Sequence, residues 1–145
     1  MVADAARIVA LARDWIGTPY VHQASVQGAG SDCLGLIRGL WRALYGSEPE
    51  AAPPYTPDWG EFGATEFLMA GAARHLPAVP RERALSAGQV LLFRMRPGAV
   101  AKHLGVLVED GAEPRFVHAY THHGVIESPL TMPWRNRIAA RFRFP

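Results

Sequence analysis

The hydrophobic period of the chain changes near Gly88, and this change limits the fold to one in which helices precede a sheet. Upstream of Gly88, apolar residues recur every three or four positions, as on one face of a helix. Downstream, short segments alternate apolar and polar residues, which is typical of strands with one buried face. This order predicts an α+β fold, with N-terminal helices packed on an antiparallel sheet of about five or six strands. The expected strands cover residues 89–95, 102–109, 115–120, 125–128 and 138–144.

Three helices are expected ahead of the sheet, each bounded by capping or helix-stopping residues. The first is capped by Asp4 and stopped by Gly17 with Pro19, the second begins at Ser31 or Asp32 and ends at Gly46, and the third covers residues 62–75. Four prolines within residues 47–59 predict an extended connection between the second and third helices.

Length and composition predict one domain, 1–145, that buries its own core. The single cysteine excludes an internal disulfide. No apolar run approaches the ~20 residues of a membrane span, so membrane insertion is not expected. Because Asp4 and Arg7 interrupt the opening segment, it does not resemble a signal peptide. We therefore expect synthesis in the cytoplasm without an export signal.

The charge pattern does not indicate a nucleic-acid partner. The formal net charge is +2, the arginines are scattered, and Lys102 is the only lysine. Near the C-terminus, Arg141 and Arg143 alternate with Phe142 and Phe144, which predicts a strand with one solvated face.

The only cysteine, Cys33, lies at the start of the second expected helix, in phase with its apolar face. Unpaired N–H groups at a helix start, together with a cationic partner, lower a thiol pKa from ~8.5 toward ~3.5–7.5. Cys33 is therefore a candidate nucleophile. Core packing is the alternative interpretation, because free cysteine is usually a small buried hydrophobe.

A histidine occupies one face of the expected strand 102–109, together with a glycine. His103, Gly105 and Leu107 share this face because side chains alternate along a strand. Glycine weakens a strand unless another element approaches closely there. We expect that element to be the helix that carries Cys33.

A hairpin brings a second histidine toward the first. The Asp110-Gly111 pair predicts a two-residue turn that places His103 directly opposite His118. Pro114 cannot donate to the ladder, so a longer loop or a bulge remains open. A register shift of two residues would still keep both histidines on one face.

Nucleophilic catalysis by a thiol needs a proton acceptor and a group that orients this acceptor. The sequence supplies all three, with Cys33 as the thiol, His103 as the acceptor and His118 as the orienting group. A metal-dependent hydrolase is the alternative, with these residues and His122 or His123 as ligands. That set lacks the tight ligand spacing of common zinc sites. We therefore expect neither a metal nor another cofactor.

Four segments of the chain resemble the NlpC-type cell-wall cysteine peptidases, a papain-like family. They are residues 17–20 (Gly-Thr-Pro-Tyr), 32–36 (Asp-Cys-Leu-Gly-Leu), 102–106 (Lys-His-Leu-Gly-Val) and 116–119 (Phe-Val-His-Ala). Leu34 stands where the family usually has serine. The resemblance implies a helical part that carries the cysteine, packed on an antiparallel sheet that carries the histidine.

The resemblance also implies an activity and a role for each site residue. The activity is amide hydrolysis in peptidoglycan stem peptides, commonly between D-γ-glutamate and a diamino acid. Cys33 would be the nucleophile, His103 its base and His118 the orienting residue. By the same resemblance, Tyr20 offers its hydroxyl to the oxyanion and Asp32 helps to bind the substrate.

Within the family, the motif of residues 32–39 and the proline-bearing insert after it are more similar to compact members in phage tails and gene-transfer particles. This implies a protein of a virion or particle tail, with tail proteins as further partners. A non-catalytic tail-assembly module on the same fold is the alternative. Acyl transfer or thioester hydrolysis by the same three residues also remains open.

Overall fold

The computed structural model describes residues 3–51 and 66–145. Its helices are α1 (Ala5–Asp14), α2 (Cys33–Tyr45), α3 (Phe67–His75) and α4 (Met132–Asn136). Its strands are β1 (Ser25–Val26), β2 (Gly30–Ser31), β3 (Ala78–Val79), β4 (Val90–Phe93), β5 (His103–Glu109), β6 (Arg115–Tyr120), β7 (Gly124–Pro129) and β8 (Ile138–Phe142). The expected start of the third helix at residue 62 and most of the expected proline connection lie outside the described residues. Within the described ranges, no helix combines the length and apolarity that crossing a bilayer requires.

The sheet confirms the predicted α+β fold. Its six strands are antiparallel in the order β3-β8-β4-β5-β6-β7, and β1 pairs with β2 in a separate hairpin. All five expected strands are present. The short strands β1, β2 and β3 and the five-residue helix α4 were not expected, because elements of this length show no hydrophobic period.

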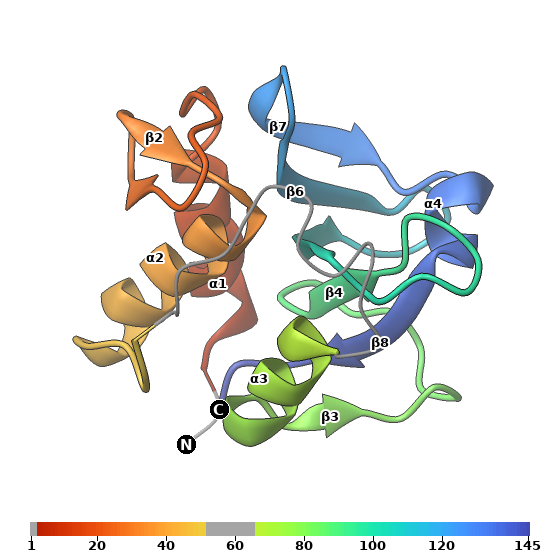
Figure 1. The fold of residues 1–145 in the computed structure, drawn as a ribbon. Helices are drawn as coiled ribbons and strands as arrows, with labels where there is room; N and C mark the ends of the chain where they lie inside the picture. The colour runs from red at the N-terminus through yellow and green to blue at the C-terminus, as the bar shows by residue number, and fades with distance from the viewer. Residues whose placement is uncertain (1–2, 52–65) are drawn as a thin grey trace.

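The sheet separates two apolar clusters, as the layers in Figure 1 indicate. On one face, α1, α2 and α3 pack on alternate residues of the strands, and Leu36 and Leu40 of α2 are fully buried there. On the other face, Phe93, Leu107 and Phe116 pack with Trp134 of α4. Both faces of the central strands are therefore buried.

Helix α2 begins at Cys33 because Asp32 caps it. The Asp32 carboxylate accepts a hydrogen bond from the Gly35 N–H at 2.7 Å, which satisfies one of the unpaired donors of the first turn. At the other end, Gly46 adopts a positive φ of 91°, a conformation that favours glycine. Of the two expected caps, the structure uses Asp32, and the predicted end at Gly46 is confirmed.

The pairing of β5 with β6 differs by two residues from the predicted register. Val106 pairs with Val117 and Leu107 with Phe116, and the register shifts before Glu109. The loop before Arg115 is longer than a two-residue turn, and Pro114 within it cannot donate to the ladder. His103 and His118 therefore are diagonal rather than direct neighbours.

Gly105 has a different role from the one predicted. A Cβ at Gly105 would lie 2.8 Å from the Phe116 ring and 3.4 Å from the His118 Cβ. These atoms belong to the neighbouring strand β6, whereas α2 packs on the opposite face of the sheet. The expectation that Gly105 makes room for the cysteine helix is wrong, and the space is occupied by β6 side chains.

Arg141 also departs from its prediction. Its side chain is buried, whereas a solvated strand face was expected. The guanidinium donates to the carbonyls of Pro80, Arg81, Arg83 and Ala84 and to Gln89 Oε1. A buried guanidinium is stable when its donors are paired, so Arg141 ties the 80–84 loop to β8.

The close approach of α1 to α2 at Gly39 yields a stability prediction. A Cβ at Gly39 would lie 2.1 Å from the buried Trp15 indole, so Gly39→Ala forces a shift of Trp15 and should reduce the free energy of unfolding by about 1–3 kcal/mol. Gly71→Ala on α3 is the matched control, because its Cβ would meet only the Arg74 side chain at 3.7 Å. Helix propensity should make that variant up to about 1 kcal/mol more stable. Urea unfolding measures the free energy of unfolding of both variants. Equal changes in Gly39→Ala and Gly71→Ala would contradict the proposed collision with Trp15.

Candidate active site

Cys33 is the first residue of α2, and its thiol lies against the start of β5. The Sγ atom is 3.6 Å from the Lys102 carbonyl oxygen, to which the thiol donates. The backbone N–H of Leu104 also faces the sulfur. The thiol is therefore positioned beside the backbone on both sides of His103, and only 9% of Cys33 is exposed.

Burial determines the charge of this thiol. Desolvation, and then the negative charge of Asp32, raise the pKa of Cys33 to about 12. The N–H groups of Cys33, Leu34 and Leu104 favour the thiolate, but their effect is smaller. The predicted lowering of the thiol pKa by the helix start is therefore wrong, because desolvation outweighs the helix dipole.

The two histidines share a hydrogen bond at the end of β5. His103 Nε2 lies 2.8 Å from His118 Nδ1, and the rings meet edge to face at 5.1 Å. Because this bond uses Nε2, the other ring nitrogen of His103, Nδ1, is the one available to take a proton from a thiol. The prediction that these two histidines lie on one face and share a hydrogen bond is confirmed, although the strand register differs by two residues from the predicted one.

Both imidazoles are neutral at neutral pH. Desolvation, with the charges of His118 and Lys102, lowers the pKa of His103 to about 3. Desolvation, with the charge of His123, lowers the pKa of His118 to about 4. With the thiol protonated as well, the resting site is an uncharged pair rather than a thiolate and an imidazolium.

Tyr20 lies close to the thiol. Its hydroxyl hydrogen-bonds Thr121, and burial followed by the charge of a Cys33 thiolate raises its pKa. Tyr20 is therefore a protonated donor at neutral pH, near the sulfur. The expected contact with an oxyanion stays a prediction.

Asp32 is buried and binds the backbone on both sides of the nucleophile. Besides capping Gly35, it accepts from the Gln23 N–H at 2.8 Å, and His22 lies 3.9 Å from the same carboxylate oxygen. These contacts anchor the 20–25 segment beside Cys33. Substrate binding by Asp32 stays a prediction.

A cleft of about 410 Å³ opens over these residues. The described residues that line it come from the 20–22 segment, the start of α2, the start of β5 and the β6–β7 turn: Tyr20, His22, Asp32, Cys33, Leu34, Met95, Lys102, His103, Ala119, Tyr120, Thr121, His122 and His123. His122 and His123 are exposed at its rim, as expected for turn residues. Within residues 3–51 and 66–145, no cluster of three or more His, Cys, Asp or Glu side chains is arranged to hold a metal ion.

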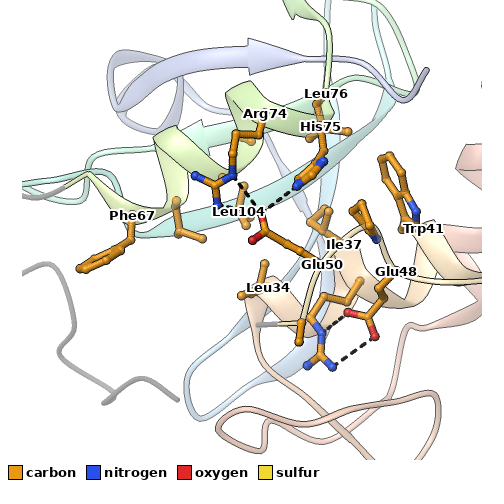
Figure 2. A pocket seen from close by; sticks show the side chains of 16 residues that line it. Leu34, Ile37, Trp41, Glu48, Glu50, Phe67, Arg74, His75, Leu76 and Leu104 are labelled. Carbon is orange, nitrogen blue, oxygen red and sulfur yellow. Dashed lines mark hydrogen bonds and ion pairs between the residues drawn. The ribbon is translucent and has the colours of Figure 1, made fainter. Parts of the chain in front are cut away.

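Leu34 separates this cleft from a second, smaller cavity of about 170 Å³. Figure 2 shows this cavity between α2 and α3, with Ile37, Trp41 and Leu104 on its walls. Its polar rim contains the ion pair of Glu50 with Arg74 at 2.7 Å. A side chain at position 34 therefore contributes to both cavities, and serine there would remove apolar surface from both.

Two residues of the site were missed by sequence reasoning. Trp134 packs its ring 5.7 Å from His103 and 5.2 Å from His118, and Ser128 Oγ lies 2.9 Å from His118 Nε2. Trp134 belongs to the five-residue helix α4, which is too short to show a hydrophobic period. A sequence signal does exist for Ser128. It lies two positions from Ile126, the β7 partner of His118, and residues two apart in a strand share one face of the sheet.

Comparison with known proteins gives sequence relatives named as endopeptidases and a consistent fold. No protein-family model matches the chain. The sequence is 30% identical over 132 residues to murein DD-endopeptidase MepS/murein LD-carboxypeptidase of Escherichia coli strain K12. This alignment covers 90% of the chain and 58% of that protein, so the chain spans little more than half of its relative.

Solved structures match the fold over nearly the whole chain. An NlpC/P60 family protein from Bacillus cereus superposes with a TM-score of 0.69 and 19% identity, over 99% of this chain and 41% of the other. The NlpC/p60 domain of the peptidoglycan hydrolase SagA superposes with a TM-score of 0.55 and 23% identity, over 88% of this chain and 91% of that domain.

The fold and the site define a class of α+β protein in which a thiol at a helix start shares a cleft with a histidine on an antiparallel sheet, and a second histidine is bonded to the first. The chain therefore has the fold of NlpC/P60 proteins, and its sequence is similar to that of a murein endopeptidase.

The uncharged resting site predicts how Cys33 reacts with iodoacetamide. Because the pKa of Cys33 is about 12, the alkylation rate of the native protein should rise about tenfold per pH unit from pH 7 to 10. The denatured chain, with an ordinary thiol pKa near 9.0, is the control and should level off above that pH. A native rate that is already constant between pH 6 and 9 would contradict the neutral pair and indicate a thiolate–imidazolium pair.

Proposed function

We propose that this protein is a peptidoglycan hydrolase, a cysteine endopeptidase that cleaves an amide bond in the stem peptide. This proposal depends on one observation: Cys33 and His103 line the same cleft, the thiol contacts the backbone on both sides of His103, and His118 is bonded to His103 at 2.8 Å. A thiol, a base and an orienting group in this order are the components of papain-like acyl transfer. The similarity to a protein named murein DD-endopeptidase supports peptidoglycan as the substrate.

The neutral resting pair specifies the first chemical step. The thiol transfers its proton to His103 Nδ1 as Sγ attacks the amide carbonyl carbon, which forms a C–S bond and an oxyanion. The backbone N–H of Cys33 and the Tyr20 hydroxyl are the donors near the sulfur that would bind this oxyanion. Proton transfer and attack are coupled, because neither ion is stable in the buried resting site.

The later steps return each group to its starting state. The His103 imidazolium donates its proton to the leaving nitrogen as the C–N bond breaks, and a thioester remains on Cys33. Water then loses a proton to His103 and attacks the thioester carbon. The C–S bond breaks, the sulfur regains its proton, and the peptide leaves with a new carboxyl group.

We assign the scissile bond to D-γ-glutamate and the following diamino acid, as the family resemblance implies. The name of the E. coli relative, murein DD-endopeptidase, points instead to a D,D bond. Cleavage at the two bonds gives products of different mass. Leu34, on the wall of both cavities, is the residue at which this chain departs from the family motif next to the nucleophile.

Hydrolysis of defined muropeptides tests the activity and the bond together. Wild-type protein should release products of γ-glutamyl cleavage, identified by mass spectrometry, and Cys33→Ala should lower the rate at least 1000-fold while the fold is retained. Chelators should leave the wild-type rate unchanged. Products of D,D cleavage would reassign the bond. Equal product formation by wild type and Cys33→Ala would refute the cysteine mechanism, and no products from either would favour a non-catalytic tail-assembly module.

We further propose that the protein acts as part of a phage-tail or gene-transfer-particle assembly, where it hydrolyses the wall locally. The motif of residues 32–39, with leucine after the nucleophile, supports this placement. Immunodetection should find the protein in purified particles at a constant ratio to tail proteins. Its presence only in the cytosol, absent from particles, would refute the placement without affecting the activity.

A further inference from the structure

We propose that Ser128 is a positioning residue, whose hydroxyl holds His118 in the protonation state that His103 needs in order to act as a base; this rests on the proposed function. Ser128 Oγ lies 2.9 Å from His118 Nε2, and His118 Nδ1 lies 2.8 Å from His103 Nε2. The three side chains form a continuous line of hydrogen bonds from His103 to Ser128. Ser128 does not line the cleft and is not placed to touch a substrate.

Each hydrogen bond between two neutral imidazoles has one donor, so two arrangements are possible. In the first, His103 Nε2–H donates to His118 Nδ1, and His118 Nε2–H donates to Ser128 Oγ. His103 Nδ1 is then a bare acceptor for the thiol proton. In the second, His118 Nδ1–H donates to His103 Nε2, and the Ser128 hydroxyl donates to His118 Nε2. His103 Nδ1 then already carries a proton and cannot act as a base.

Once His103 has taken the thiol proton and become an imidazolium, only the first arrangement is possible. A His103 imidazolium carries protons on both nitrogens, so its Nε2–H must donate to His118 Nδ1. His118 then carries its own proton on Nε2, and Ser128 Oγ is the acceptor within reach. A site that already rests in the first arrangement needs no proton rearrangement when His103 becomes charged.

Burial makes this acceptor important. His118 is 1% exposed, and the rings of Phe116 and Trp134 lie 4.2 Å and 5.2 Å from its ring. An N–H group left unpaired in such surroundings is unfavourable, because it loses its bonds to water and gains none in return. Ser128 is held in place by the β6–β7 ladder, where it pairs with Phe116, two positions from His118 along β6.

A pair of matched variants isolates the hydroxyl. Ser128→Thr keeps it, whereas Ser128→Val has nearly the same shape without it. On muropeptides, Ser128→Val should lower kcat about tenfold with KM unchanged, and Ser128→Thr should retain most of kcat. Thr131→Val is the control for loss of a hydroxyl elsewhere, because Thr131 is exposed and makes no side-chain capping bond. Its kcat should equal that of the wild type.

A spectroscopic measurement tests the inference without activity. ¹⁵N NMR of the histidine rings in wild type and Ser128→Thr should show His118 protonated on Nε2 with Nδ1 bare. Ser128→Val should lose the protected Nε2–H signal. His118 protonated on Nδ1 in the wild type, or equal kcat for folded Ser128→Thr and Ser128→Val, would overturn the role of Ser128. A protein inactive on peptidoglycan that shows the expected NMR pattern would refute only the proposed function.

Discussion

The antiparallel pairing of β5 with β6 is the constraint on which the candidate site depends. It places His103 and His118 on one face of the sheet, on adjacent strands, with their rings 5.1 Å apart. It also explains why residue 105 is glycine, since a side chain there would collide with Phe116. The start of β5 also lies against α2, so that Cys33 meets the backbone around His103.

Desolvation has the largest effect on the chemistry of this site. Helix starts and cationic neighbours favour thiolates, but that effect depends on how much water the thiol retains. Here Cys33 is buried between α2 and β5, and both imidazoles are covered by aromatic rings. The resting groups are therefore neutral, and in the proposed mechanism charge develops only as the sulfur attacks a carbonyl carbon.

Sequence patterns predicted the long elements and the candidate residues, and they failed where the outcome depends on distant segments. Local periodicity and capping predicted the five expected strands, a helix start at Ser31 or Asp32 and its end at Gly46, and the two histidines on one face of neighbouring strands. Trp134 and Ser128 were missed because neither lies in a motif, and both reach the histidines through the tertiary fold. Arg141 was misassigned because an alternating strand pattern does not reveal a loop that covers its polar face.

By itself, the sequence determined the order of helices and strands, the helix start that carries the only cysteine, and the two strands that carry the histidines. These features depend on spacing and on local capping, which are encoded within a few residues. Only the tertiary structure decided the hairpin register, the neutral charge of the thiol and the imidazoles, and the chain of hydrogen bonds that ends at Ser128. Each of these depends on burial and on contacts between segments far apart in the chain, because desolvation and side-chain pairing are set by what packs around a group.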